Sequence, residues 1–380
     1  MSLKAGFSRF FAAQPDRLHF AAHSHHPWPD VSYDAHKRAW KDAAALADDK
    51  WKRVFGEVMP ETRGMIAEVL GIQGSDTLVF GPNTHGFLVR LFSCFEPPVR
   101  ILSTDAEFHS FARQSRRWEE AGLAIVDRVP AEPFNTFSDR FTLEARSGAH
   151  DLIYLSHVFF DSGFVVHDVD RIVSSVSEER AFIVVDGYHA FMALPVNIGA
   201  IQDRAFYLAG GYKYAMAGEG VCFMHTPPGY GERPVDTGWY AGFAQLEPGV
   251  SSVVPYGEDG TRFSGATFDV SGAYRMRAVL EWLAAEGVGP AEISAHVSGL
   301  QRRFLEAGVL PGDLLPPSDI ARGNFLTFQT PGAQALYEAL HQRGVITDYR
   351  YDRLRIGFGI YHDETDVDRL IETLDSVLPV

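Results

Sequence analysis

Cysteine is scarce in this sequence, with only Cys94 and Cys222 among 380 residues. Because two isolated cysteines within apolar runs offer neither a disulfide framework nor the spacing of zinc ligands, we expect a reducing, cytoplasmic setting. No apolar run reaches the length of a membrane span, and the start does not resemble a signal peptide, so we expect no insertion into a membrane. Basic residues are outnumbered, 34 against 49 acidic, and the net charge of −15 disfavours nucleic acid and anionic membrane surfaces as partners.

What the sequence does contain is a set of apolar runs that end in single charged residues. Residues 182–185 are apolar without alternation, as in a strand buried on both faces of a parallel sheet, and Asp186 follows them. The run 205–209 is followed by Gly210-Gly211-Tyr212 and then by Lys213. Since open α/β sheets bind ligands beyond the carboxyl ends of their strands, we expect an acid and an amine at one site.

Pyridoxal phosphate (PLP) is a cofactor that needs both groups. A lysine holds its aldehyde as a Schiff base, and an aspartate keeps the pyridine nitrogen protonated so that the ring can draw electrons from the substrate. The spacing alone is equally compatible with an aspartate that caps a turn and a lysine on the surface.

Two segments around the acid and the amine resemble kynureninase, a fold-type I PLP enzyme of the class V aminotransferase group. They are Asp186-Gly187-Tyr188-His189 and Gly210-Gly211-Tyr212-Lys213-Tyr214, the second followed by Gly218-Glu219-Gly220. In pieces, the resemblance spans nearly the whole chain. It implies that Lys213 carries the cofactor and moves the Cα proton of an amino acid, and that Asp186 contacts the pyridine nitrogen. It also implies that Tyr212 binds the phosphate or relays a proton, and that His189 supports Asp186 or the ring oxygen.

The order of the apolar runs predicts the architecture. Runs that end near residues 80, 103, 155, 185 and 209 alternate with helical patterns, which favours a mostly parallel sheet flanked by helices. This α/β arrangement suits the PLP-dependent transferase fold type I, with a large domain and a smaller α+β C-terminal domain. An amphipathic helix after Asp269 marks the expected boundary. We therefore expect an N-terminal arm over 1–30 that contributes to the active site, a large PLP-binding domain over 31–270 and a small domain over 271–380.

Further cofactor contacts are expected after two of the strands. Free backbone N–H groups at the start of the helix that follows Asn83 and Thr84 suit a phosphate, although these residues also make an ordinary helix cap. The resemblance implies that both residues grip the cofactor's phosphate. Kynureninases stack a phenylalanine on the pyridine ring, and Phe108 matches it. Because class V aminotransferases usually stack a histidine instead, His109 is the alternative.

Two later segments imply a site shared between subunits. Thr237-Gly238-Trp239-Tyr240 is similar to a Gly-Trp-Phe-Gly element of kynureninases. Residues 262–267 are similar to a stretch whose Thr or Asn reaches the phosphate of the neighbouring subunit. If Trp239 and Thr267 complete the site of a partner, the protein is an obligate homodimer.

Substrate-binding residues are expected from both ends of the chain. Leu354-Arg355-Ile356-Gly357-Phe358 resembles the Leu-Arg-Phe-Gly-Phe element of kynureninases, and the Arg355 guanidinium would hold an α-carboxylate in a bidentate pair; a salt bridge at the rim is the alternative. Near the N-terminus, Ser24 matches one residue of an Asn-Ser-Leu-Gly segment that approaches the substrate. No carboxylate or cysteine completes a metal-ligand set among the adjacent histidines, so we expect no metal at His23, His25 and His26.

The resemblance implies hydrolytic cleavage of the Cβ–Cγ bond of kynurenine or its 3-hydroxy form. His23, His25 and Phe111 replace family residues on the substrate side, so a class V aminotransferase or lyase with another amino acid as substrate is the alternative. A cysteine desulfurase is disfavoured because neither Cys94 nor Cys222 lies in a mobile, polar loop. A protein that binds PLP without turnover is the alternative of another class.

Overall fold

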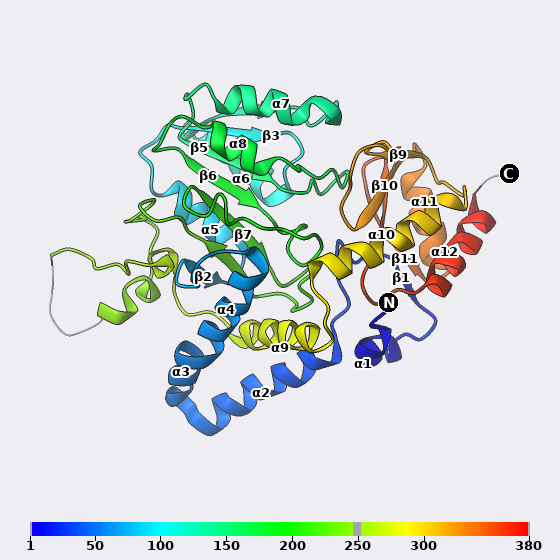
Figure 1. Cartoon of the computed structure of the whole chain (residues 1–380), viewed down its shortest axis with the longest axis horizontal. Coiled ribbons are helices and arrows are strands. Elements are labelled where there is room, and N and C mark those ends of the chain that lie inside the picture. Colours follow the sequence, from blue (N-terminus) through cyan, green and yellow to red (C-terminus); the bar gives the residue numbers. More distant parts are fainter. Residues whose placement is uncertain (1, 246–251, 379–380) are drawn as a thin grey trace.

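The computed structural model describes residues 2–245 and 252–378, and a seven-stranded sheet dominates this part of the chain. The sheet has the order β2-β8-β7-β6-β5-β3-β4. Its strands are β2 (Leu78–Gly81), β3 (Val99–Thr104), β4 (Ala124–Val129), β5 (Leu152–Ser156), β6 (Phe182–Asp186), β7 (Ala205–Gly210) and β8 (Cys222–His225). Only β8 runs antiparallel to its neighbours, so the carboxyl ends of the other strands meet at one edge (Figure 1).

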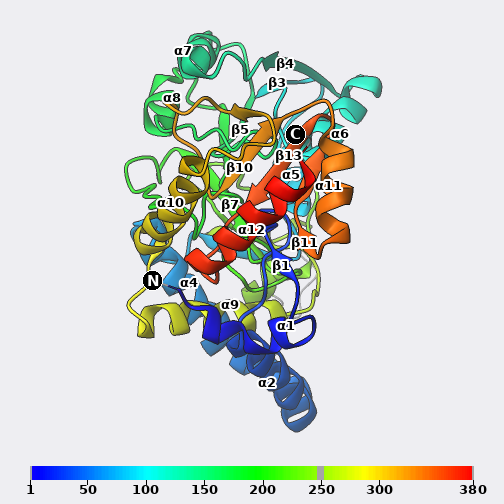
Figure 2. The same ribbon diagram turned by 90° about the vertical axis from the view of Figure 1, so that its right-hand side faces the viewer.

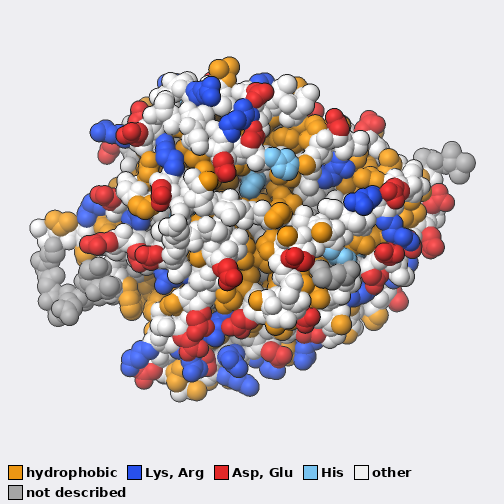
Figure 3. Space-filling view, in the orientation of Figure 1, with side chains coloured by type: hydrophobic (Ala, Val, Ile, Leu, Met, Phe, Trp, Pro, Cys, Tyr) orange, Lys and Arg blue, Asp and Glu red, His pale blue; other side chains and the backbone are white. Residues whose placement is uncertain are grey.

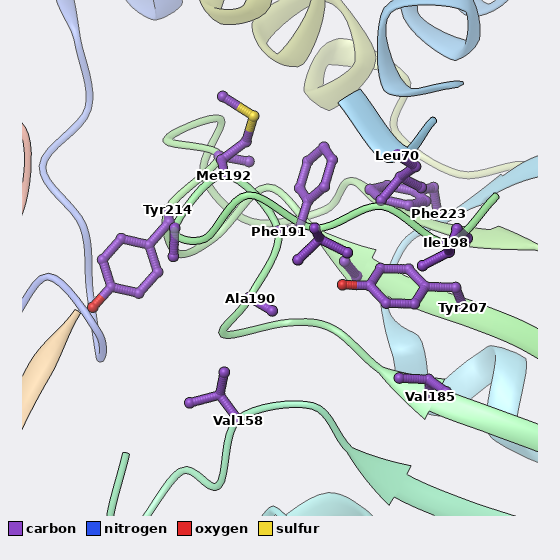
Figure 4. Packing of buried hydrophobic residues seen from close by; sticks show 14 of the residues in the cluster. Leu70, Val158, Val185, Ala190, Phe191, Met192, Ile198, Tyr207, Tyr214 and Phe223 are labelled. Atoms are coloured by element: carbon purple, nitrogen blue, oxygen red, sulfur yellow. The ribbon is translucent and has the colours of Figure 1, made fainter. Parts of the chain in front are cut away.

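Both faces of this sheet are buried under helices. One face carries α5 (Thr84–Phe92) and α6 (His109–Glu120), and the other carries α4 (Met59–Leu70), α7 (Phe134–Ala145), α8 (Val169–Ser175) and α9 (Ser271–Ala285). Successive strand residues enter different cores: Val184 packs on the α5 side and Val185 on the α9 side. Figure 4 shows part of the second core, where the ring of Tyr207 points toward Phe191. Burial on two sides is the reason why these strands are continuous apolar runs.

A helical segment leads into the large sheet. It comprises η1 (Lys4–Phe7), α1 (Ser8–Ala12), α2 (Asp30–Leu46), η2 (Ala47–Asp49), α3 (Lys50–Arg53) and the π-helical turn η3 (Val54–Val58). Helix α2 packs along α9. Helix α4 ends at Gly71, whose φ of 67° is a left-handed conformation that glycine adopts without strain.

The C-terminal part forms a smaller α+β unit. Its antiparallel sheet has the order β12-β13-β10-β9, made of β9 (Asp313–Leu315), β10 (Phe325–Gln329), β12 (Asp348–Arg350) and β13 (Arg353–Gly357). The helices of the unit are α10 (Pro290–Glu306), α11 (Ala333–Gln342) and α12 (Glu364–Val377), which lie in front of the large sheet in Figure 2. The N-terminal arm joins this unit because β1 (Leu18–His19) pairs in parallel with β11 (Val345–Ile346). The N-terminal arm and the C-terminal unit are therefore joined by this strand pair.

The predicted fold class is confirmed by this arrangement, and two strands of the large sheet were missed. Edge strand β4 alternates between buried and exposed residues and contains Asp127 and Arg128, so its sequence lacks an unbroken apolar run. Strand β8 (Cys222–His225) is short and ends in a histidine. Buried residues of α9 share the core of the large sheet. We therefore propose a domain boundary between α9 and α10, later than the position 271 suggested by the sequence pattern.

Two 3-10 segments, η4 (Trp239–Gln245) and η5 (Gly260–Phe263), pack on each other, and η5 contacts β2. Acidic and basic side chains are interspersed over the face shown in Figure 3. Across the described ranges, no helix is both long enough and apolar enough to span a bilayer.

Candidate active site

A cavity of about 440 Å³ lies at the carboxyl edge of the large sheet and is bordered by the N-terminal arm and the C-terminal unit. Its wall combines residues from seven separate segments of the sequence. The residues expected from the sequence that line it are Ser24, Asn83, Thr84, Phe108, Asp186, His189, Tyr212, Lys213 and Arg355. Trp239 and Thr267 do not line it.

The amine of Lys213 is buried inside this cavity. Its Nζ contacts Nε2 of His189 and lies 5.3 Å from the ring centroid of Phe108 and 5.6 Å from that of Tyr188. Burial lowers the pKa of Lys213 to about 7; the charge of Arg355 acts in the same direction, and that of the carboxylate at 186 opposes it. Much of the amine is therefore uncharged at neutral pH, which is the form that reacts with an aldehyde.

The carboxylate of Asp186, at the end of β6, is fixed by two donors. The hydroxyl of Tyr154 on β5 donates to Oδ2 at 2.7 Å, and the backbone N–H of Tyr188 donates to Oδ1 at 3.0 Å. Burial raises the pKa of Asp186, whereas these hydrogen bonds and the amine of Lys213 lower it. Of the two roles expected for His189, support of Asp186 is not seen in the structure, because Tyr154 makes that contact.

A second buried carboxyl group, Glu107, lies beside this site and was not expected from the sequence. Ser156, the register partner of Asp186, donates its N–H to Glu107 Oε1 at 3.0 Å, and its Oγ lies 2.5 Å from Oε2. Burial raises the pKa of Glu107 to about 8, and the charge of Asp186 acts in the same direction. With a pKa of about 8, Glu107 is largely protonated at neutral pH.

The N-terminus of α5 opens into the cavity. Strand β2 delivers it to this edge, and Asn83 caps the helix by accepting the Gly86 N–H at 2.8 Å. Asn83, Thr84 and His85 all line the cavity. Because the first N–H groups of a helix lack partners within the helix, this end provides donors and a positive dipole for an anionic group. Asn83 thus acts as a cap and also forms part of the wall.

The two candidates for a ring platform occupy different places. Phe108 lines the cavity and is 41% exposed. His109 lies outside the lining and packs edge-on against Phe160, with ring centroids 5.0 Å apart. The geometry therefore favours Phe108 over His109 as the aromatic surface of the cavity.

The guanidinium of Arg355 is buried, and only some of its N–H groups have hydrogen-bond partners among the described residues. Its Nε and Nη2 donate to Asp348 Oδ1 at 3.2 and 2.7 Å, and its Nη1 donates to the carbonyl oxygen of Phe160. Of the five N–H groups of an arginine, these contacts leave one on each terminal nitrogen. These two N–H groups remain available as donors to a carboxylate. Arg350 also lines the cavity and donates to the same Asp348 oxygen at 2.9 Å.

The histidines of the N-terminal arm have separate environments. His25 Nδ1 lies 3.3 Å from the hydroxyl of Tyr212, and His26 Nδ1 lies 2.8 Å from the carbonyl oxygen of Pro27. His23 is buried and lines the cavity. Among the residues that the structure describes, no three histidine, cysteine or acidic side chains form a group able to hold a metal ion.

Trp239 and Thr267 lie together on the surface, away from the cavity of their own chain. The indole Nε1–H of Trp239 donates to Thr267 Oγ1 at 3.0 Å, and Trp239 is 42% exposed. This position is compatible with the expectation that both residues serve a neighbouring subunit, which remains a prediction.

Together, the fold and the buried lysine and aspartate define a PLP-dependent enzyme of fold type I. Residues 37–307 match the family model described as aminotransferase class-V, so the chain belongs to this family. Residues 312–374 match the model described as kynureninase C-terminal domain. The resemblance to the wider class V group seen in the sequence is thus confirmed.

Different relatives of this chain are named for different activities. A probable cysteine desulfurase of Vibrio cholerae is 23% identical over 344 residues, which cover 83% of this chain and 81% of the relative. A kynureninase of Burkholderia mallei is 29% identical over 239 residues, which cover 59% of this chain and 55% of the relative.

Solved structures match over nearly the full length. The cystine C-S lyase C-DES, in complex with its product cysteine persulfide, has a TM-score of 0.83 at 16% identity and covers 97% of this chain and 100% of its own. A cysteine desulfurase from Thermococcus onnurineus NA1 has a TM-score of 0.81 at 16% identity, with 99% and 98% covered. At such identities the likeness establishes the fold and does not select a reaction.

The residues of the cavity fit PLP. The largely uncharged amine of Lys213 suits the aldehyde, the carboxylate of Asp186 suits a protonated pyridine nitrogen, and the N-terminus of α5 suits the phosphate. In addition, Nδ1 of His189 is buried, and the described part of the chain offers it no hydrogen-bond partner. Such an unpaired buried nitrogen is expected where a ligand supplies the missing partner.

Proposed function

We propose that this chain acts on an α-amino acid and that its reaction is a kynureninase-like hydrolysis of a Cβ–Cγ bond. The observation that carries the proposal is that Lys213, Asp186 and Arg355 line one cavity. The first two groups serve the cofactor, and the third has two N–H groups left for a substrate carboxylate. An amino acid is the ligand that needs all three.

Each cavity residue then has a distinct task toward the cofactor. When bound, PLP supplies an electron sink for negative charge that develops at the substrate's Cα. Asp186 would hold the pyridine nitrogen, and Phe108 would cover one face of the ring. The phosphate would be held by Asn83, Thr84, Tyr212 and the first N–H groups of α5.

Lys213 and Arg355 would handle the substrate. Lys213 Nζ would hold the cofactor, and the same amine would take the proton from the substrate's Cα and return it. Arg355 fixes the α-carboxylate through its two remaining N–H groups, and Ser24 approaches the same side. His189 Nε2 contacts Lys213 in the structure and would then be free to bind the ring oxygen.

Two observations support the kynureninase-like reaction over desulfuration. Residues 312–374, which match the kynureninase C-terminal domain, include Arg355 and its partner Asp348. Burial raises the pKa of both Cys94 and Cys222 to about 12. Neither cysteine therefore offers the exposed thiolate that a sulfur acceptor needs.

The test is an assay with L-kynurenine on protein loaded with PLP. We expect fluorescent anthranilate to form together with alanine, and we expect the visible absorbance of the bound cofactor to be absent from Lys213→Ala. Lys41→Ala, a change at an exposed lysine, serves as the control and should behave as the unmodified protein. Conversion of PLP to pyridoxamine phosphate without anthranilate would replace the hydrolase by an aminotransferase. Binding of PLP without turnover of any amino acid would leave a non-catalytic binding protein.

We also propose that the site is completed by a second copy of the chain through Trp239 and Thr267. Mixed subunits provide the test. Trp239→Ala and Lys213→Ala should each be inactive alone, and mixing them should restore part of the activity, because one site then combines intact residues from both chains. If mixing restores nothing while both variants still dimerise, the shared site is wrong.

A further inference from the structure

His23 is an unusual feature of the cavity wall, because it is completely buried and yet unpaired. The side chain has an exposed fraction of 0% and lines the cavity that contains Lys213 and Arg355. Neither ring nitrogen has a hydrogen-bond partner within the described residues. A buried polar group without a partner destabilises the folded protein, so its presence calls for a ligand that supplies the partner.

The ring of His23 is held in place by apolar packing. It stacks on Phe325 of β10, with centroids 4.7 Å apart and planes 20° apart. On Gly357, an added Cβ would lie 2.1 Å from His23 Nδ1, so the ring occupies the space of the missing side chain. The position of the imidazole is thus fixed by the C-terminal unit before any ligand enters.

Burial and nearby charge keep the ring of His23 neutral. Burial lowers the pKa of His23 well below its usual range, and the positive charges of Arg355 and Arg350 act in the same direction. Acidic groups on the same side are already engaged, since Asp348 binds both arginines. A neutral imidazole has one N–H donor and one acceptor nitrogen, so it recognises an uncharged polar group better than a second cation.

We propose that His23 is a specificity-determining residue that forms a hydrogen bond with an uncharged polar group on the side chain of the substrate amino acid. The inference rests on the proposed function, because it needs an amino acid whose carboxylate is held by Arg355. It assigns to His23 the recognition of a carbonyl, hydroxyl or amide group in the side chain and disfavours substrates with purely hydrocarbon side chains. A site built to hydrogen-bond such a group rejects the analogue that lacks it.

Pairs of amino acids that differ in one polar group test the inference in the PLP-loaded protein. The probes are 2-amino-4-hydroxy-4-phenylbutanoate against 2-amino-4-phenylbutanoate, and L-asparagine against L-leucine. Dissociation constants are read from the change in absorbance of the bound cofactor. We expect the unmodified protein to prefer the polar member, and His23→Phe to reduce that preference about tenfold or more. His23→Leu provides a second apolar replacement and should give the same result.

His26 supplies the matched control, because it is equally buried in the same segment but has a partner in Pro27. His26→Phe should keep the preference for the polar member and lower the Tm of the cofactor-free protein. His23→Phe should not lower that Tm, because it removes nitrogens that had no partner.

Two results would overturn the inference in different ways. An unchanged preference in both His23 variants would assign the ring to packing and leave the proposed function intact. A loaded protein whose absorbance responds to none of the four amino acids would instead reject the amino-acid substrate, and the inference with it.

Discussion

The buried amine of Lys213 should destabilise the cofactor-free protein, and its replacement should therefore stabilise the fold. The pKa of Lys213 falls from its ordinary value of 10.5 to about 7 through burial. At ~1.36 kcal/mol per pKa unit, this drop makes the folded state less stable by on the order of 4 kcal/mol at pH 7. Lys213→Met keeps a similar apolar stem and removes the charge, so we expect a gain of that order in the free energy of unfolding.

The sign of the pH dependence follows from the lowered pKa. Between pH 7 and pH 10.5 the unfolded chain binds more protons at this site than the folded one, so stability rises with pH. The advantage of Lys213→Met should therefore shrink to about 1 kcal/mol at pH 10.

Urea unfolding of the cofactor-free proteins at pH 7 and pH 10 measures both quantities. Lys41→Met, at an exposed lysine, is the control and should change stability by no more than about 0.5 kcal/mol at either pH. A Lys213→Met protein that is less stable than the unmodified one at pH 7, or whose advantage does not depend on pH, would refute the reasoning.

Three further predictions concern neighbouring groups. Glu107 has a pKa raised from 4.5 to about 8, so the stability it contributes is full in acid and is lost as the pH rises through this range. In urea unfolding, the free energy of unfolding of the unmodified protein, relative to that of Glu107→Gln, should fall by on the order of 3 kcal/mol between pH 5 and pH 8. Tyr154→Phe removes a donor to Asp186 and so raises the pKa of that carboxyl, and the affinity for PLP, measured by absorbance on dilution, should fall about tenfold; equal affinity would contradict the role of Tyr154. Arg355→Lys keeps the charge but loses the paired N–H groups, so KM for the amino acid should rise about tenfold or more while PLP stays bound, whereas an unchanged KM would move the carboxylate site elsewhere.

The cofactor half of the site was predictable because its residues follow strands. Unbroken apolar runs identified β6 and β7, and the residues that follow such strands meet at one edge of a parallel sheet. Asp186 and Lys213 were therefore brought together by topology alone. The resemblance then suggested site residues that no local pattern indicates, such as Phe108, which lines the cavity.

Residues whose importance depends on contacts with other elements of the fold were not predictable in this way. Tyr154 looks like any apolar strand residue until β5 is placed beside β6. Glu107 comes three residues after the end of β3, close to the same edge of the sheet at which Asp186 ends β6, and this position is the signal that could have revealed it. Both ring nitrogens of His23 lack a hydrogen-bond partner among the described residues, and this could not be read from the sequence because it depends on the packing around the ring. Spacing also left two roles open for His189, and in the structure its ring contacts Lys213 while Tyr154 and the backbone of Tyr188 bind Asp186.

The pairing of β1 with β11 has a consequence for how such enzymes can be altered. The residues that we propose to face the amino acid, His23, Ser24 and Arg355, are encoded near the two termini, whereas those that we propose to hold the cofactor are encoded between positions 83 and 213. A cassette exchange that replaces 18–26 and 345–357 together would transplant selectivity from one homologue to another and spare the catalytic middle of the gene. Exchanging one cassette alone would mismatch the strand pair that joins them.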